Sequence, residues 1–347
     1  MSNPESGTSR FGARPRKVVR LSGEALVKTR YFHPETPLPL VIEPATEGIN
    51  LIEWVRDQRD YVAGELDKHG GILFRNFDVG TTDEFEAFIA AACSTPLQYT
   101  ERSSPRSQVS GNIYTSTDYP PTESIFLHNE QSYNLTFPTK ILFFCLQPAE
   151  AGGETPIADS RNVLARLRPD VRDRFVEQGY MYVRNFGDGF GLPWQEAFQT
   201  ADPAEVEAYC GKNQIEHEWR DGGRRLRTRQ VRRVLAQHPR NGQKTWFNHL
   251  TFFHVSTLAP HIRDSMLREF SAEELPNNTY YGDGSPIEPE VLDHLRETYR
   301  AETVTFPWRK GDILLLDNML VAHGRSPFSG PRKLVVGMAD LASWESS

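Results

Sequence analysis

Apolar residues in the first third of the chain recur at the spacing of a helix and then form a short continuous run. Between residues 50 and 68 they fall at roughly helical period, and Gly70 with Gly71 ends this segment. Residues 71–77, GILFRNF, form an apolar run of strand length. Residues 82–93 carry a threonine cap and an acidic first turn before further apolar residues. We therefore expect a helix, a strand and a second helix in this order.

From about residue 110 the pattern changes to short runs that are rich in β-branched and aromatic residues. Proline and glycine separate these runs, which are NIYTSTDYP, SIFLHNE, KILFFCLQP and TPIADS. The end of the chain returns to the same pattern in GDILLLDN, MLVAHGRS and RKLVVGMADL. The stretch between them is polar and largely helical in pattern, with strand candidates in YMYVRNF, IEHEW and KTWFN. A jelly roll can bracket an insert in this way because its first and last strands lie side by side.

We therefore predict a mainly β fold with flanking helices, built on a jelly-roll core with a large helical insertion. Residues 1–45 are rich in proline and arginine and predict an extended N-terminal arm. Residues 46–347 predict a single jelly-roll domain, with the insertion at about residues 160–300.

Composition narrows the classes of function. The 347 residues carry a net charge of -7 with no polybasic block, which argues against nucleic acid and an anionic membrane as partners. No apolar run approaches the roughly 18 residues of a membrane span, and the basic N-terminus lacks the apolar stretch of a secretory signal. The 3 cysteines show no CxxC spacing, so neither a disulfide framework nor a zinc ribbon is expected. These features favour a cytoplasmic location.

Histidine and acidic residues supply a candidate metal site. An octahedral iron(II) site of an oxygenase needs two imidazoles and one carboxylate on one face. A His-x-Glu triplet on a strand offers two of these ligands, because residues i and i+2 point the same way. The sequence has two such triplets, at residues 33–35 and 128–130, and with 10 histidines and 46 acidic residues about one is expected by chance. The first lies in the proline-rich arm, while His128 and Glu130 follow a plausible strand.

A third ligand and an anion clamp come from the C-terminal part. His323 ends the run MLVA beyond the apolar strand ILLL and a tight turn, and Arg332 opens the next strand. A guanidinium at that place can bind a carboxylate with two parallel hydrogen bonds. The alternative is a buried histidine followed by a surface arginine. His249 and His254 are five residues apart, which is not the spacing of one helical face, and no HExxH, phosphate-binding loop or GxSxG motif is present.

These stretches resemble the taurine/2-oxoglutarate dioxygenase family (TauD/TfdA-like), and within it the clavaminate synthase-like branch and the syringomycin-type aminoacyl hydroxylases. The similarity is carried by IYTSTDYPPTESIFLHNEQSY, GGETPIADSR, YVRNFGDGFGLPWQEAFQTAD and NMLVAHGRSPFSGPRKLVV, across residues of about 112 to 338. The resemblance implies a double-stranded β-helix (cupin-like jelly-roll) core and an enzyme that uses iron(II), 2-oxoglutarate and O2. It assigns the metal to His128, Glu130 and His323, and 2-oxoglutarate to Thr155 and Arg332. The alternative for Thr155 is a residue that merely starts a strand after a glycine turn.

Three positions bear on the substrate. The resemblance makes halogenation unexpected, because related halogenases have a small residue where this chain has Glu130. Relatives that act on free amino acids or taurine tend to carry a further arginine four residues after the 2-oxoglutarate arginine, where this chain has Val336. This departure suggests a substrate without a free acid there, such as an amino acid tethered to a peptidyl carrier protein. Arg325 and Asn248 are candidate substrate contacts; the alternative for Arg325 is a salt bridge at the barrel rim.

The sequence thus predicts a dioxygenase that hydroxylates an unactivated C–H bond of an amino-acid-derived small molecule, free or carrier-bound, in natural-product (antibiotic) biosynthesis. A same-family oxidase that desaturates or cyclises its substrate is an alternative, which sequence does not separate from hydroxylation. The third alternative is a jelly-roll binding protein without turnover, which an incomplete metal triad would favour.

Overall fold

The computed structural model describes residues 23–97, 108–115, 119–187, 189 and 191–345. Helices account for 32% and strands for 34% of the structure. The expectation of a mainly β fold is therefore wrong, and the fold is mixed α/β. The excess helix lies before the β-rich region and in the insertion, where seven α-helices occur among the described residues.

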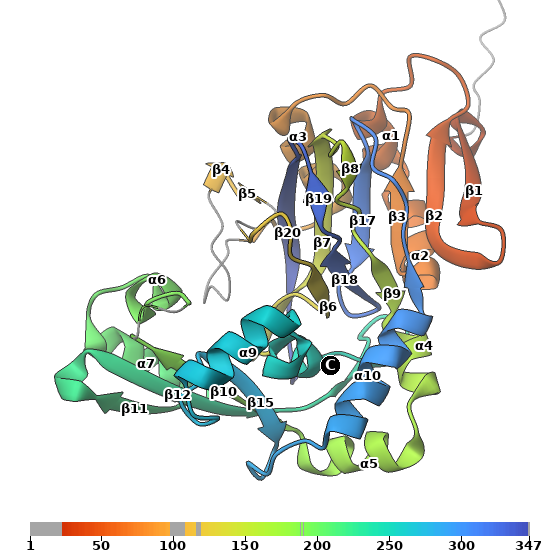
Figure 1. The fold of residues 1–347 in the computed structure, drawn as a ribbon. Coiled ribbons are helices and arrows are strands. Elements are labelled where there is room, and N and C mark those ends of the chain that lie inside the picture. The colour runs from red at the N-terminus through yellow and green to blue at the C-terminus, as the bar shows by residue number, and fades with distance from the viewer. Residues whose placement is uncertain (1–22, 98–107, 116–118, 188, 190, 346–347) are drawn as a thin grey trace, which may run out of the picture.

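An eight-stranded sheet forms the centre of the molecule (Figure 1). Its strands are ordered β1-β2-β3-β17-β7-β20-β5-β4 within the described residues. Their bounds are β1 Val27–His33, β2 Thr36–Pro44, β3 Gly71–Phe74, β4 Gln108–Ser110, β5 Ile113–Thr115, β7 Thr136–Gln147, β17 Ile313–Asp317 and β20 Lys333–Ser343. Alternation along β17 sends Ile313 and Leu315 to one face and Leu314 and Leu316 to the other. Both faces are buried, as the apolar run ILLL predicts.

Three N-terminal helices cover one face of this sheet. They are α1 Leu51–Asp57, α2 Arg59–His69 and α3 Thr82–Ala92. The single helix expected over residues 50–68 is divided at Gln58, whose backbone leaves the helical region, and Gly70 ends α2 in the left-handed conformation. The predicted cap of α3 is confirmed, because Thr81 and Glu84 form a capping box. None of the helices that the structure describes is long and apolar enough to cross a membrane.

A four-stranded sheet packs on the opposite face. Its order is β16-β9-β18-β6, with bounds β6 Ile125–His128, β9 Ile157–Asp159, β16 Thr303–Val304 and β18 Val321–Arg325. Side chains from both sheets, among them Phe143, Leu314 and Val321, share one buried cluster. The short strands β8 Ala151–Gly152 and β19 Phe328–Ser329 pair beside it. The chain passes back and forth between the two sheets from β5 to β7 and from β17 to β20, as the predicted jelly roll requires.

The N-terminal arm is a correction to the sequence prediction. Strands β1 and β2 form a hairpin, and β2 adds to the sheet in parallel with β3 through Leu40 to Ile42. Pro37 and Pro39 lie on β2 before Leu40, where pairing with β3 begins, so neither proline removes a hydrogen bond of that pairing. The predicted arm is therefore part of the domain from Val27 onward; residues 1–22 lie outside the described residues.

The insertion has a sheet of its own (Figure 1). Its strands are β10 Tyr180–Phe186, β11 Glu216–Arg220, β12 Arg225–Arg232 and β15 Asn277–Tyr281, in the order β11-β12-β10-β15. A hairpin of β13 Leu235–Gln237 and β14 Lys244–Trp246 lies outside this sheet. The helices are α4 Ser160–Arg166, α5 Pro169–Gln178, α6 Trp194–Phe198, α7 Pro203–Lys212, α8 Leu250–Phe253, α9 Pro260–Glu269 and α10 Pro289–Ala301, with short 3-10 turns at Gly23–Leu26, Asp221–Gly223 and Val255–Thr257. The predicted strand candidates thus correspond to β10, β11 and β14.

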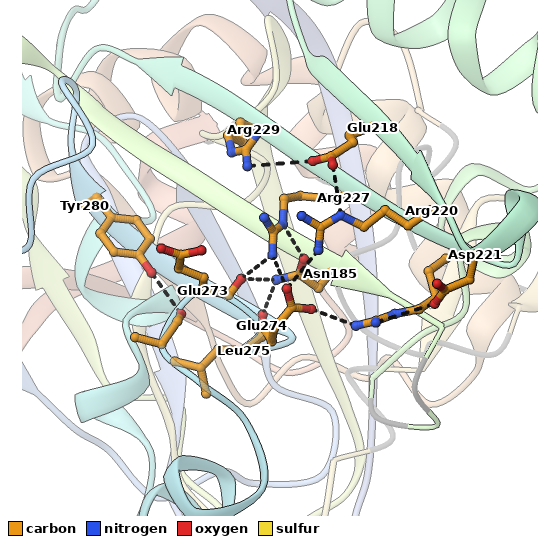
Figure 2. A network of polar contacts seen from close by, with 12 residues as sticks. Asn185, Glu218, Arg220, Asp221, Arg227, Arg229, Glu273, Glu274, Leu275 and Tyr280 are labelled. Atoms are coloured by element: carbon orange, nitrogen blue, oxygen red, sulfur yellow. Dashed lines mark hydrogen bonds and ion pairs between the residues drawn. The ribbon is translucent and has the colours of Figure 1, made fainter.

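A cluster of ion pairs fastens the segment before β15 to this sheet (Figure 2). The Glu274 carboxylate binds Arg220, Arg225 and Arg227 at 2.8, 2.7 and 2.6 Å. Asn185 also donates its amide to the backbone carbonyls of Glu273 and Leu275. The cluster fixes the outer face of the insertion sheet, whose inner face carries Tyr182 and Tyr180 toward the centre of the molecule.

One buried ion pair joins β3 to the entry of β17. Arg75 donates through Nε and Nη2 to Asp312 at 3.0 and 2.6 Å, and both side chains are 1% exposed. We expect Asp312→Ala to lower the free energy of unfolding by about 3–5 kcal/mol, because it leaves a buried guanidinium without its charge partner. Urea denaturation measures this loss.

The matched control is the exposed pair of Arg30 and Glu43, at 3.1 Å. Glu43→Ala should cost less than about 1 kcal/mol, since solvent screens this pair. Equal losses in Asp312→Ala and Glu43→Ala would contradict the role given to burial.

Candidate metal centre

Three potential ligands meet between β6 and β18. His128 is the last residue of β6, and His323 lies directly opposite it on β18 in the antiparallel ladder. Glu130 follows two residues later, beyond the end of β6. One donor atom from each of the three side chains lies within 4.8 Å of the others, and all three residues are buried. The structure therefore brings together the residues that the sequence proposed as ligands.

Hydrogen bonding and packing orient the two imidazoles. His128 Nδ1 lies 2.9 Å from the carbonyl oxygen of Phe126. A ring nitrogen beside a carbonyl carries the proton, which leaves Nε2 as the lone pair for a metal. Phe252 stacks on the His128 ring at 4.5 Å, and Phe143 contacts the His323 ring at 5.2 Å. These apolar walls limit the access of water.

The donor set fits iron(II). Two imidazoles and one carboxylate on one face form the ligand set of non-haem iron(II) oxygenases. His323 Nε2 and Glu130 Oε2 are 4.0 Å apart, which is longer than a hydrogen bond and leaves room for an ion between them. Glu130 is only 2% exposed, and burial of a carboxylate is favourable when a cation binds it.

Gly324 explains how β18 approaches β6 so closely. A Cβ atom at this position would lie 2.5 Å from the carbonyl oxygen of Ile125. The ladder is irregular between His323 and Arg325. A residue with a side chain would push the strands apart at the ligand pair, so the glycine of the run HGR belongs to the geometry of the site.

Thr155 and Arg332 lie on the other side of β18. The amide of Gly324 donates to Pro156, and that of Ser326 to Glu154, which holds Thr155 beside the strand that carries His323. Thr155 is 2% exposed, and its hydroxyl oxygen accepts a hydrogen bond from Trp308 Nε1 at 3.2 Å. This contact leaves the hydroxyl hydrogen available to a ligand oxygen.

Arg332 is held by the glycine turn that precedes Thr155. Its Nε donates to the carbonyl of Gly153 at 3.0 Å. Gly153 has φ +74°, and a Cβ there would lie 3.0 Å from the Arg332 side chain, so glycine makes room for the guanidinium. Burial, followed by the charge of Arg325, lowers the pKa of Arg332 to about 10. A largely buried arginine beside a second cation favours an anionic ligand, and the residues therefore fit a carboxylate of 2-oxoglutarate.

The structure gives different roles to the two candidate substrate contacts. Arg325 donates to the backbone carbonyls of Tyr119, Pro120 and Glu123 at 2.9, 2.6 and 2.9 Å. It therefore holds the loop that leads into β6. Asn248 donates to the carbonyl of Val234 and accepts from Leu250 N, which makes it a backbone contact at the start of α8.

His249 is a site residue that the spacing argument missed. Its ring lies 5.1 Å from that of His128, and its Nδ1 is 2.7 Å from the hydroxyl of Ser132. Burial, then the charges of His128 and His323, hold the pKa of His249 well below its usual range, so the ring is neutral. The spacing of His249 and His254 was judged only by whether both could lie on one face of a helix. The contact between His249 and His128 instead comes from packing of α8 against β6. His33, from the other His-x-Glu triplet at residues 33–35, lies at the exposed end of β1, near Thr305.

Comparison with known proteins places this geometry in a family. The family model described as taurine catabolism dioxygenase TauD, TfdA family matches residues 34–338. The dapdiamide synthesis protein DdaC of Enterobacter agglomerans is 41% identical over 275 residues, which cover 79% of this chain and 83% of that protein. A clavaminate synthase-like protein of Arabidopsis thaliana is 28% identical over 338 residues, covering 91% and 97%.

Solved structures agree in fold. A taurine dioxygenase from Burkholderia xenovorans has a TM-score of 0.50 at 15% identity, with 93% of both chains covered. AAD-2 in complex with Mn(II) and N-oxalylglycine has a TM-score of 0.50 at 14% identity, covering 90% of this chain and 96% of that one. With the family model matching most of its length, the chain belongs to the TauD/TfdA family of iron(II)- and 2-oxoglutarate-dependent dioxygenases.

Proposed function

We propose that this dioxygenase hydroxylates an unactivated C–H bond of an amino-acid-derived substrate, free or carrier-bound, in natural-product biosynthesis, as the syringomycin-type aminoacyl hydroxylases do. In this proposal His128, Glu130 and His323 hold iron(II), and Thr155 and Arg332 hold the distal carboxylate of 2-oxoglutarate. The observation that carries it is the buried triad, with two histidines opposite each other on paired strands and Glu130 just beyond them. A largely buried arginine and a threonine hydroxyl lie beside the strand of His323.

In this proposal some residues of the site bind the metal and 2-oxoglutarate, and others exclude water. Iron(II), 2-oxoglutarate and dioxygen together supply the oxidant for the C–H bond, with succinate and carbon dioxide as by-products. Arg332 provides charge, and Thr155 provides a hydroxyl whose oxygen is already occupied by Trp308. Phe143 and Phe252 shield the imidazoles, which keeps water from the place where the substrate reacts.

We also propose that the chain forms a single jelly-roll domain, which begins near Val27 and carries the insertion at about residues 160–300. Alternation of the chain between the eight-stranded and four-stranded sheets supports it. The inner face of the insertion sheet reaches the site through Tyr182, which stacks on Phe253 at 4.2 Å, and through Phe253, which contacts His249 at 4.7 Å. We infer that the insertion forms the substrate side of the site.

Two observations support the substrate class. The relative DdaC is named for dapdiamide synthesis, a natural-product pathway. Val336 is fully buried in the cluster between the two sheets, so no cation extends from that position toward a substrate acid. A substrate whose carboxyl is masked as a carrier thioester meets this requirement. Desaturation and cyclisation use the same site and differ only in the fate of the substrate after C–H cleavage.

Anaerobic addition of iron(II) and 2-oxoglutarate to the protein should produce a metal-to-ligand charge-transfer band. His128→Ala and Glu130→Ala should abolish it, because each removes one of three protein ligands. His33→Ala serves as the control, since it alters the exposed His-x-Glu triplet at residues 33–35 and should leave the band unchanged. If the wild-type protein gives no band, and no succinate forms when air is admitted, the proposed function is wrong.

The affinity for 2-oxoglutarate should depend on Arg332 and Thr155. Arg332→Met should weaken binding by about tenfold to a hundredfold, because it removes a charge-assisted hydrogen bond, and Thr155→Val by a few-fold to about tenfold. Titration of the charge-transfer band measures both. Lys333→Met removes the adjacent exposed cation and should leave the affinity for 2-oxoglutarate unchanged. If Arg332→Met binds 2-oxoglutarate with wild-type affinity, Arg332 does not bind the co-substrate.

Substrate form is tested by coupled succinate release. Free amino acids and the same amino acids loaded as thioesters on a peptidyl carrier protein are compared at equal concentration. We expect turnover of the loaded form to exceed that of the free acid by at least about tenfold. A free carboxylate would need a charged partner, which Val336 does not supply, and one such contact contributes about tenfold. Efficient turnover of free acids alone would refute the interpretation of Val336.

A further inference from the structure

The carboxylate ligand lies outside the sheet that holds the two imidazoles. Strand β6 ends at His128, and residues 130–133 form a turn. The ladder between β6 and β18 fixes His128 opposite His323, and Glu130 follows beyond the end of β6. A metal ligand needs a fixed position, so the contacts that hold the backbone of Glu130 in the turn bear directly on the site.

The side chain of Asn318 makes that contact. Its Oδ1 accepts from Glu130 N at 2.7 Å, and its Nδ2 donates to the carbonyl of Glu130 at 2.9 Å. The amide thus exchanges both hydrogen bonds with one residue, as a partner residue does in an antiparallel ladder. The second hydrogen of Nδ2 goes to Pro138 at 2.7 Å, and Asn318 is 0% exposed.

The backbone of Asn318 is fixed as firmly as its side chain. Its N–H donates to the carbonyl of Thr139 on β7 at 2.8 Å. Its own carbonyl accepts from Nδ2 of Asn129, the residue between the two ligands of the triplet, at 2.8 Å. Asn318 therefore joins the start of β7 to both residues that follow His128.

The preceding residue holds the turn itself in shape. Asp317 Oδ1 accepts from the backbone N–H groups of Met319 and Leu320 at 2.9 and 3.0 Å. Its Oδ2 lies 2.9 Å from Nε2 of His238, which comes from the insertion. Both carboxylate oxygens are thus used within the protein.

We propose that Asn318 is a positioning residue for the metal: its side-chain amide holds the backbone of Glu130 so that the carboxylate meets the imidazoles of His128 and His323. The inference rests on the proposed function, since it assumes that these three residues bind iron(II). Asn318 lies five residues before His323 on the same turn and strand, so one rigid segment sets the distance between Glu130 and His323.

The experiment measures metal affinity in folded protein. Anaerobic calorimetry with Mn(II) and 2-oxoglutarate, together with the ligand-field spectrum of the Co(II) form, is applied to wild type, Asn318→Ala and Asn318→Asp. We expect metal binding to weaken by about 10–100-fold in Asn318→Ala, as for other groups that orient ligands. Asn318→Asp keeps the acceptor for Glu130 N but loses both donors. Its metal affinity should therefore lie between those of wild type and Asn318→Ala, and its Co(II) spectrum should change.

Asn278→Ala is the matched control, because Asn278 is a buried asparagine that accepts one backbone hydrogen bond, from Val255. It should lower the melting temperature without altering metal affinity or the Co(II) spectrum. Wild-type affinity and spectrum in Asn318→Asp, or an equal loss of metal binding in Asn278→Ala, would overturn the inference. If wild-type protein itself binds no metal, it is the proposed function that fails.

Discussion

The antiparallel contact between β18 and β6 places His323 opposite His128, and the rest of the site is arranged around it. Two strands that are distant in sequence have to approach closely here, and Gly324 permits this because a Cβ would meet the carbonyl of Ile125. On the other side of β18, the same strand aligns residues 154–156 through backbone hydrogen bonds. One strand thus carries His323, a proposed metal ligand, and aligns the segment of Thr155, a proposed contact of 2-oxoglutarate.

Two further constraints complete the site from outside the ladder. The turn of Asp317 and Asn318 holds Glu130, and the glycine turn at Gly153 holds Arg332. Neither constraint is a long-range charge interaction; both are hydrogen bonds with fixed direction, buried at Glu130 and partly buried at Arg332, whose loss would leave polar groups unpaired. Beside Thr155 the charge is positive, because Arg332 lies near Arg325; burial and the charge of Arg325 lower the pKa of Arg332, and an anionic ligand is favoured there.

The sequence predicted the residues of the site better than their local structure. His128, Glu130 and His323 were found because apolar runs marked two strands. Glu130 lies beyond the strand that ends at His128, so the argument that residues i and i+2 of a strand point the same way does not apply to this pair. Their role as iron ligands, and that of Thr155 and Arg332 toward 2-oxoglutarate, stay predictions. Arg325 was a candidate substrate contact, but the partners that the structure shows for it are carbonyls some 200 residues earlier in the chain, which local sequence does not reveal. His249 reaches His128 only through tertiary packing.

The fold shows the same division between local and long-range information. The threonine cap of α3 and the apolar strand β17 are local and were predicted. The pairing of β2 with β3 and the sheet in the insertion depend on contacts between distant segments, which local patterns specify weakly.

Iron-edge anomalous diffraction from crystals grown anaerobically with iron(II) and 2-oxoglutarate tests the central claim most directly. The account predicts one strong peak bonded to Nε2 of His128, a carboxylate oxygen of Glu130 and Nε2 of His323. A peak at another cluster, such as that of His238 and Asp317, with none at the triad, would contradict it.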